Sequence, residues 1–227
     1  MGMGKAYPER QKNRFKSKRV YDTMKTGKSE SGKGESAVLY VSQYHRNFSN
    51  RKEELEYQRA LVKKLLQWAL SREYGLDLPT LHQDRTPEGK PFFTDCPVHF
   101  SLSHCRGLVC CALSQSPVGV DGESLRPFSK RLVQRACTAE ELAWLSTQPD
   151  QDAAFLSLWT LKESVMKLSG QGMAYGFQKA SFTFEDGKPH FREPDVRVSQ
   201  FSLSGGWMVS AVSREETFSE LHFADLT

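Results

Sequence analysis

Three acidic residues and one lysine stand at spacings that could bring them together. Asp121 and Glu123 belong to the stretch G-V-D-G-E at residues 119–123, and the apolar run 117–120 leads directly into Asp121. Such a run predicts a buried strand, and residues two apart on a strand project from the same face. Further along, Glu163 and Lys167 occur in L-W-T-L-K-E-S-V-M-K, four residues apart as on one face of a helix. Carboxylates beside an ammonium suit Mg²⁺ and a phosphate group.

A strand and a helix must position these side chains. The helix is predicted by leucines and a valine at 3-4-3 spacing, which would face the core: Leu158, Leu161, Val165 and Leu168. On the strand, Gly122 would let a backbone or a ligand approach closely. Each piece alone also has a structural interpretation. A D-x-E pair at a strand end can be a solvated turn, and Glu163 with Lys167 can be a surface ion pair.

The order G-x-D-x-E and then W-x-x-K-E-S-x-x-K resembles the 4′-phosphopantetheinyl transferases of the large, surfactin-synthetase-activating type. The resemblance implies transfer of phosphopantetheine from coenzyme A to a carrier-protein serine, with release of adenosine 3′,5′-bisphosphate. It implies Mg²⁺ held by Asp121, Glu123 and Glu163, with Lys167 neutralising phosphate charge. Glu163 or a metal-bound water would take the serine proton. Gly122, usually aliphatic, and Ser124, often basic, depart from the family pattern.

Composition places the chain among cytoplasmic proteins. Its 227 residues suffice for one large domain or two fused halves of about 100 residues. No apolar run approaches the ~20 residues that span a membrane, and the N-terminus lacks the apolar core of a signal peptide. The five cysteines include no C-x-x-C pair. This argues against a disulfide framework or a zinc site and for a reducing compartment.

The net charge of +4 resides in the N-terminal segment. Residues 1–37 hold ten Lys and Arg and four Asp and Glu, whereas the remainder has a net charge of −2. We expect residues 1–37 to be a basic leader that is flexible or foreign to the native protein; contact with an acidic partner is the alternative. Residues 27–34 nearly spell a phosphate loop, but Gly34 replaces the required Ser or Thr. We expect a coincidence in a polar linker.

A helix is predicted from Asn50, a capping residue, to about Arg72, with a stop near Gly75. Its apolar stripe consists of Leu55, Val62, Leu66 and Ala69, with Leu65 and Leu70 alongside. Arg59 falls on that stripe, where a buried arginine is costly unless paired. It either reaches to the edge or faces an anionic ligand. The resemblance implies a coenzyme A contact, because the family carries an arginine in the corresponding helix.

Two further segments could contact coenzyme A. The turn 85–91 contains Arg85 and the G-K-P sequence, in which the family's lysine meets coenzyme A; Arg85 and Lys90 are therefore predicted phosphate contacts. A strand through residues 98–102 is predicted to break at residues 103–107. The family has N-x-S-H there, and its histidine meets the 3′-phosphate. The resemblance thus implies that Ser103 and His104 bind coenzyme A, although a histidine in a turn can also be purely structural.

The remaining elements follow from local signals. Predicted are a strand at 37–40, a hairpin return at 108–113, a capping box at 138–141, a helix from Asp150 to Gly170, a hairpin turn at Asp186–Gly187, and strands at 201–203 and 207–212.

A repeated four-residue sequence predicts that the fold consists of two similar halves. F-S-L-S occurs at residues 100–103 and again at 201–204, each time after a predicted helix. We therefore expect an α+β pseudo-dimer of two similar halves, residues 38–118 and 119–227, as in the family, acting as a monomer. Gly205 in the second copy corresponds to His104 in the first, which fits a single site.

Three classes of function remain open. The first is the transferase, with coenzyme A and an apo acyl or peptidyl carrier protein as partners and Mg²⁺ as cofactor. The second is a non-catalytic module that binds coenzyme A or a carrier protein. The third is nucleic-acid binding through residues 1–37, but these residues contain no recognisable binding motif, so no nucleic-acid or membrane partner is expected. The sequence does not reveal whether the carrier serves fatty-acid, polyketide or peptide synthesis.

Overall fold

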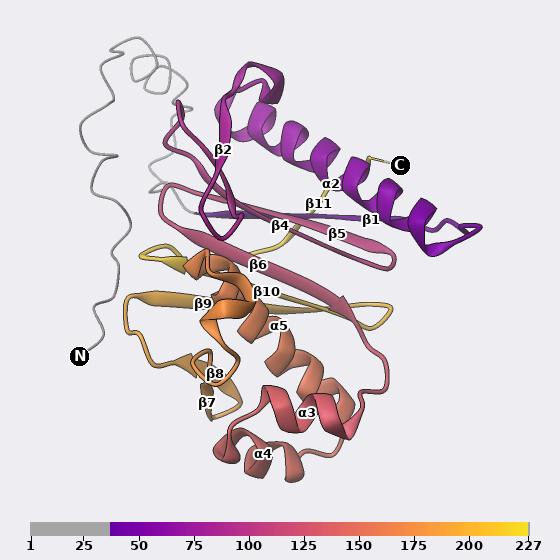
Figure 1. Cartoon of the computed structure of the whole chain (residues 1–227), viewed down its shortest axis with the longest axis vertical. Helices are drawn as coiled ribbons and strands as arrows, with labels where there is room; N and C mark the ends of the chain where they lie inside the picture. Colours follow the sequence, from indigo (N-terminus) through magenta and orange to yellow (C-terminus); the bar gives the residue numbers. More distant parts are fainter. Residues whose placement is uncertain (1–36, 227) are drawn as a thin grey trace. The chain divides into compact units, whose positions relative to one another are not determined.

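The computed structural model describes residues 37–226. All but one residue of the predicted leader, and the whole phosphate-loop-like run, lie outside this range. The described part of the chain contains helices together with strands that pair mostly antiparallel, with one parallel pair. The α+β prediction is therefore confirmed (Figure 1). No helix among residues 37–226 is long and apolar enough to cross a membrane.

The first layer joins a long helix to a sheet. The sheet has the order β11-β1-β5-β4, and the chain forms β1 (Val38–Gln43), α2 (Arg51–Tyr74), β4 (His99–Cys105) and β5 (Leu108–Ser114) in turn. Strand β5 pairs antiparallel with both β1 and β4. The edge strand β11 (His222–Phe223) comes from the end of the chain and pairs parallel with β1. A small hairpin of β2 (Gln83–Arg85) and β3 (Pro91–Phe93) precedes β4.

The second layer repeats this plan. Strand β6 (Val118–Ser124) leads to α5 (Gln151–Ser169) and then to the hairpin of β9 (Val196–Leu203) and β10 (Trp207–Arg214). The sheet order is β6-β10-β9, so the second strand of the hairpin again lies in the middle. Each layer is therefore a strand, a helix and a hairpin. The helices α2 and α5 lie on the outer sides of the two sheets (Figure 1).

The two copies of the four-residue repeat F-S-L-S do not occupy equivalent positions in the two layers. Phe100 pairs with Leu113 near the start of β4, whereas Phe201 pairs with Val209 near the end of β9. Gly205 lies in the turn after β9, and His104 lies within β4, so the predicted correspondence of these two residues is wrong. The layers are alike in strand order, not in the register of F-S-L-S. The boundary between residues 118 and 119 stays a prediction.

Local capping explains where the two long helices begin and end. The side chain of Asn50 accepts a hydrogen bond from the Glu53 amide at 3.0 Å, and α2 ends at Gly75 in the left-handed conformation. Asp150 caps α5 in the same manner through the amide of Ala153, and Gly170 ends that helix at φ 75°. Both helices thus have the bounds that the sequence predicts.

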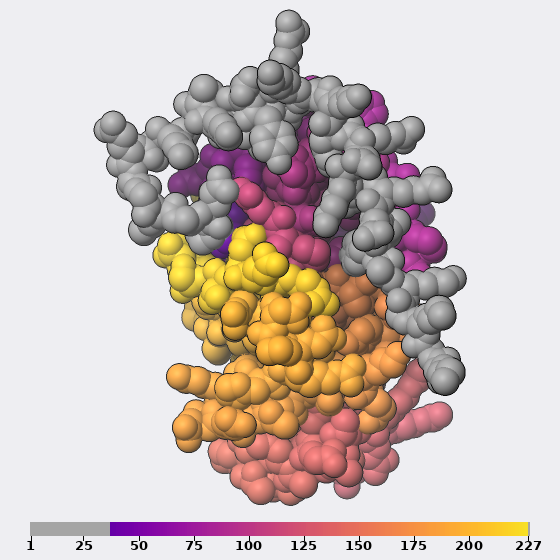
Figure 2. All heavy atoms as spheres, turned by 90° about the vertical axis from the view of Figure 1, so that its left-hand side faces the viewer, coloured from indigo at the N-terminus to yellow at the C-terminus, as the bar shows by residue number. Residues whose placement is uncertain are grey.

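Besides the apolar side chains that α2 buries against its sheet, two clusters of buried residues stand out among residues 37–226. One lies between the two sheets and includes Leu39, Val41, Cys110, Val120 and Val209, all at most 1 % exposed. The other lies between α5 and four smaller elements: α3 (Lys130–Ala136), α4 (Ala139–Ser146), β7 (Phe182–Glu185) and β8 (Lys188–Phe191). Figure 2 shows the segments that end the chain, orange to yellow, above the helices α3 and α4.

The sheets also meet along one pair of edges, where serine hydroxyls replace a strand ladder. Ser101 Oγ accepts the amide hydrogen of Val120 at 3.0 Å, and Ser103 Oγ accepts that of Gly122 at 3.3 Å. The hydroxyls occupy backbone donors of β6 that would otherwise lack a partner in a buried place. This junction places the end of β4 beside the acidic end of β6.

Candidate active site

Strand β6 presents its acidic residues to helix α5. Residues 119, 121 and 123 share one face by strand alternation, and on that face a Cβ at Gly119 would lie 1.9 Å from the carbonyl oxygen of Ser164. The helix therefore rests directly on the strand. On the opposite face, a Cβ at Gly122 would lie 2.7 Å from Cys110 Sγ. Gly122 thus admits the packing of β5 onto β6 rather than a ligand.

An ion pair joins the helix to the strand. Lys167 Nζ donates to Asp121 Oδ1 at 2.8 Å and to the carbonyl oxygen of Leu102 at 3.3 Å. Ser103 Oγ donates to the same Asp121 oxygen at 2.8 Å. Asp121 is 6 % exposed, and the Lys167 side chain is 29 % exposed. An ammonium carries three donors, and two of those on Lys167 have partners among residues 37–226.

The three carboxylates crowd one another. Burial, with smaller contributions from Asp121 and Glu123, raises the pKa of Glu163 to about 7. Burial and the charge of Asp121 likewise raise the pKa of Glu123. Lys167 opposes both effects. The sequence-based expectation of three carboxylates near one ammonium therefore agrees with the fold, although the assignment of their roles stays a prediction.

The donor set fits a divalent cation. Asp121 Oδ2 is buried and accepts no hydrogen bond in the described part of the chain, which is unusual for a charged oxygen. A hard cation at that oxygen would also relieve the repulsion that raises the pKa of Glu163. Among residues 37–226, however, no three acidic, cysteine or histidine side chains already surround a common point. Magnesium at Asp121, Glu123 and Glu163 is therefore a proposal.

His104 lies among positive charges. Burial lowers the pKa of its imidazole, and Lys167, Arg59 and Arg51 lower that pKa further, whereas Asp121 raises it. These charges come from α5, α2 and β6. The cations that act on the imidazole thus outnumber the one carboxylate that does, which favours an anion nearby. His104 lies on β4 and not in a turn, because the strand continues to Cys105 and only Arg106 and Gly107 connect it to β5.

Arg59 does not lie on the buried face of α2, and the predicted stripe is wrong at that end of the helix. Arg59 is exposed, while Glu54 and Gln58 are buried in its place. Polar residues hold these positions because partners satisfy them: Arg51 Nη1 bonds Glu54 Oε2 at 2.7 Å, and Gln58 bonds the end of β4. Sequence reasoning missed Gln58 because a search for apolar periodicity passes over an amide.

The ammonium group of Lys90 donates hydrogen bonds to two backbone carbonyl oxygens. Its Nζ donates to the carbonyl oxygens of Val118 at 2.9 Å and Leu168 at 3.3 Å, and burial lowers its pKa to about 8. Lys90 and Lys167 both line a cavity of about 280 Å³. The lysine thus ties the start of β6 to the end of α5, and two of its three donors have partners in the part of the chain that the structure describes.

Arg85 lies apart from the carboxylate cluster. It is exposed, and its Nη1 donates to the carbonyl oxygen of Gly89 at 2.7 Å, within the same hairpin. No contact joins it to Asp121, Glu123 or Glu163 in the part of the chain that the structure describes. Its predicted contact with a phosphate is untested.

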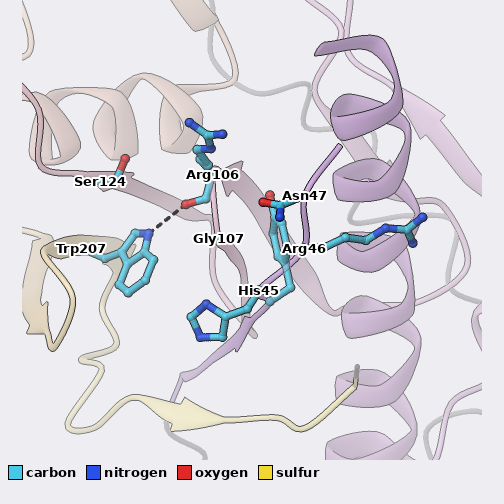
Figure 3. A pocket seen from close by; sticks show the side chains of 8 residues that line it. His45, Arg46, Asn47, Arg106, Gly107, Ser124 and Trp207 are labelled. Carbon is cyan, nitrogen blue, oxygen red and sulfur yellow. Dashed lines mark hydrogen bonds between the residues drawn. The ribbon is translucent and has the colours of Figure 1, made fainter. Parts of the chain in front are cut away.

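A larger hollow of about 470 Å³ opens at the hairpin tips beside Ser124. Trp207 Nε1 donates to the carbonyl oxygen of Arg106 at 2.9 Å and forms one wall. Figure 3 shows the guanidinium groups of Arg46 and Arg106 pointing away from one another. The cations around the hollow therefore do not converge as an anion site requires.

A buried ion pair fixes the other side of α5. Lys162 Nζ lies 2.7 Å from Glu141 Oε2 and donates to the carbonyl oxygen of Phe177 at 2.9 Å, with both charged side chains at most 1 % exposed. The second oxygen of Glu141 accepts the amide hydrogen of Phe182. The pair anchors α4 and the segment after α5 to the side of the helix that faces away from β6.

The sequence of this chain is similar to those of known proteins. The profile of the 4′-phosphopantetheinyl transferase superfamily matches residues 117–212. The 4′-phosphopantetheinyl transferase psf-1 of Bacillus pumilus is 32% identical over 177 residues, which cover 73% of this chain and 75% of psf-1. The 4′-phosphopantetheinyl transferase Sfp of Bacillus subtilis (strain 168) is 27% identical over 164 residues, or 69% of this chain and 73% of Sfp.

Among solved structures, the holo-[acyl-carrier-protein] synthase of Thermotoga maritima is similar to part of the chain. The match has 21% identity and a TM-score of 0.38, and it covers 44% of this chain and 64% of that protein.

Proposed function

Because this chain belongs to the 4′-phosphopantetheinyl transferase superfamily, we propose that it moves phosphopantetheine from coenzyme A to a serine of an apo acyl or peptidyl carrier protein. The observation that carries the proposal is the junction of α5 and β6. There, Lys167 lies 2.8 Å from Asp121, and Glu163 has a pKa of about 7. Phosphoryl transfer needs such positioning and charge neutralisation more than covalent chemistry.

In the reaction the serine oxygen attacks the β-phosphorus of coenzyme A. The bond from that phosphorus to the bridging oxygen breaks, and adenosine 3′,5′-bisphosphate leaves. Lys167 donates to a phosphate oxygen as negative charge develops, because its position is fixed by Asp121 and the Leu102 carbonyl. Glu163 would take the serine proton; its pKa of about 7 is that of the protein without a cation, and Mg²⁺ beside it would lower that pKa and favour the carboxylate that a general base needs.

Asp121, Glu123 and Glu163 would hold Mg²⁺. When bound, the cation would neutralise the pyrophosphate and polarise its oxygens. Two observations support a cation at this place. Asp121 Oδ2 is buried and accepts no hydrogen bond from residues 37–226, and the neighbouring carboxylates repel one another. Ser103 orients Asp121 by donating to the other carboxylate oxygen.

The adenosine end of coenzyme A would reach the cations at His104. His104 and Arg59 would bind the 3′-phosphate, and Lys90 would reach a phosphate from the cavity that it lines with Lys167. Arg85 would contribute from the neighbouring hairpin. The protein would act in the cytoplasm as a monomer, with carriers of fatty-acid, polyketide or peptide synthesis as the candidate acceptors.

Incubation with coenzyme A, Mg²⁺ and a panel of apo carrier proteins tests the proposal by intact mass. The wild type should add one phosphopantetheine group to at least one carrier, and Asp121→Asn should not at the same enzyme concentration. Glu140→Gln, at the exposed start of α4, is the matched control and should be as active as the wild type. A panel that stays unmodified while a known transferase modifies it would contradict the proposal.

A further inference from the structure

Gln58 connects α2 to the end of β4 through a fully buried amide. The residue is 0 % exposed. Its Nε2 donates to the carbonyl oxygen of Cys105 at 3.0 Å and to the hydroxyl of Tyr44 at 2.7 Å, with Glu54 Oε1 at 3.5 Å. Its Oε1 lies 3.0 Å from Nδ1 of His104. Every polar atom of the amide thus has a partner.

The orientation of this amide follows from the chemistry of its neighbours. The Cys105 carbonyl oxygen can only accept a hydrogen bond, so the nitrogen of Gln58 must face it. A reversed amide would place two acceptors opposite each other in a buried site. The Tyr44 hydroxyl donates its own hydrogen to the same carbonyl at 3.1 Å, so it accepts from Gln58. The amide oxygen of Gln58 therefore faces His104.

An amide oxygen only accepts, and this fixes the hydrogen on the imidazole. Nδ1 of His104 must be the donor in that contact. The neutral ring then carries its hydrogen on Nδ1 and leaves Nε2 bare, whereas the charged ring donates through both nitrogens. Gln58 satisfies Nδ1 in either state, so the ring can gain a proton at Nε2 without losing this bond.

We propose that Gln58 is a positioning residue that holds His104 with Nδ1 protonated and Nε2 reserved for the phosphate of the ligand. The proposal rests on the proposed function, because it takes that phosphate to be the 3′-phosphate of coenzyme A. A bare Nε2 cannot donate to an anion until it takes up a proton, so binding of the 3′-phosphate is coupled to protonation of His104.

The surroundings of the imidazole favour this coupling. Four charged groups influence the pKa of this imidazole: Lys167 of α5, Arg51 and Arg59 of α2, and Asp121 of β6. Three of them are cations and one is a carboxylate. Burial and the three cations lower the pKa of His104, so the free ring is neutral at pH 8. A bound phosphate supplies the missing negative charge, and the resulting bond is charge-assisted.

The tautomer can be measured directly on the unaltered protein. Nitrogen NMR of the protein with ¹⁵N-labelled histidine distinguishes protonated from bare ring nitrogens, and His104→Ala identifies the signals. At pH 8 without ligand we expect a protonated Nδ1 and a bare Nε2, and on addition of coenzyme A a protonated Nε2 as well. A free protein with its hydrogen on Nε2 would overturn the proposal.

A variant pair tests the role of the amide. Gln58→Met keeps the length of the side chain but cannot accept from Nδ1. It should give a mixture of tautomers, bind coenzyme A about ten-fold more weakly and lose most of the proton uptake that calorimetry in two buffers reports. Tyr44→Phe removes a different partner of Gln58 and leaves its bonds to Cys105 and His104 in place. This control should keep the wild-type tautomer.

Dephospho-coenzyme A, which lacks the 3′-phosphate, separates the two proposals. Gln58→Met should bind it as the wild type does. Equal losses for both ligands would show that Gln58 only supports the fold, and the positioning role would be wrong. A wild type that binds both ligands equally well, yet shows a bare Nε2, would instead refute the 3′-phosphate contact and leave the tautomer assignment standing.

Discussion

Gly119 of β6 and Ser164 of α5 touch through their backbones. A Cβ at Gly119 would lie 1.9 Å from the carbonyl oxygen of Ser164 and 2.5 Å from the amide nitrogen of Leu168. No side chain separates the helix from the strand at this point. The distance of 2.8 Å between Lys167 and Asp121 depends on this contact, so the glycine determines the geometry of the charged groups.

Gly119→Ala should therefore reduce both stability and transfer. The clash is with backbone atoms, so α5 as a whole must shift. We expect a loss of about 2–3 kcal/mol in the free energy of unfolding and a transfer rate at least ten-fold lower, because Lys167 moves away from Asp121. Urea unfolding and intact-mass assays would measure the two effects.

Gly122→Ala provides a matched comparison on the same strand. Its Cβ would meet the side chain of Cys110 at 2.7 Å rather than a backbone. Cys110→Ala in the same chain should restore most of the lost stability, but it should not restore Gly119→Ala. Equal rescue of both glycine variants would mean that α5 is not held by the contact at Gly119.

The elements predicted best from the sequence carry their own local signals. The helix from Asp150 to Gly170 has a capping side chain, a 3-4-3 apolar stripe and a terminal glycine, and all three occur as expected. The hairpin turn at Asp186 and Gly187 likewise follows from two residues that accept positive φ. In these cases interactions within a few residues decide the structure.

The site could be predicted only in part, because its geometry depends on distant contacts. The proximity of Glu163 and Lys167 to the acidic strand could be predicted from the spacing of two motifs alone. The buried positions of Glu54 and Gln58 could not be inferred, because the partners that satisfy them lie elsewhere: Arg51 one turn away and Cys105 on β4. Strand β4 extends through His104 because that residue pairs with Val109, a register that the sequence does not specify.

The exposure of Arg59 changes what its substitution should do. Arg59→Leu adds an apolar group to an exposed face, so the free energy of unfolding should change by less than about 0.5 kcal/mol. The variant should bind coenzyme A more weakly and raise the pKa of His104, because Arg59 lowers that pKa in the wild type. Lys63→Leu, also exposed on α2, is the control and should leave both properties unchanged. Equal affinities in the two variants would remove Arg59 from the ligand site.

Glu163 should trade stability for activity. Its pKa in the folded protein is raised from 4.5 to about 7. The folded state thus binds the proton more tightly than the unfolded chain does, and stability should fall as pH rises from about 4.5 to 7. Glu163→Gln should remove this loss and stabilise the metal-free protein at pH 8 by about 2 kcal/mol, while it lowers transfer by at least ~100-fold. Thermal unfolding at pH 5 and pH 8 measures the first effect.

Magnesium should reduce the gain from that substitution. If Asp121, Glu123 and Glu163 share the cation, added Mg²⁺ should stabilise the wild type at pH 8 but scarcely affect Glu163→Gln. Glu140→Gln, outside the cluster, should respond as the wild type does. Identical responses of all three proteins would exclude Glu163 as a ligand.

His104 should make the stability of the free protein depend on pH in the opposite sense. Its pKa is lowered by burial and by Lys167, Arg59 and Arg51, so the unfolded chain binds the proton more readily. The contribution of His104 to stability should therefore fall as pH drops from about 6.5 towards the lowered pKa. Saturating coenzyme A should abolish this fall, because the 3′-phosphate favours the charged ring, whereas dephospho-coenzyme A should not. His104→Ala should remove the difference between the pH profiles with the two ligands, and His190→Ala, at an exposed position, should retain that difference. Thermal unfolding between pH 5 and pH 8 with each ligand tests this; an unchanged profile in His104→Ala would show that another group titrates.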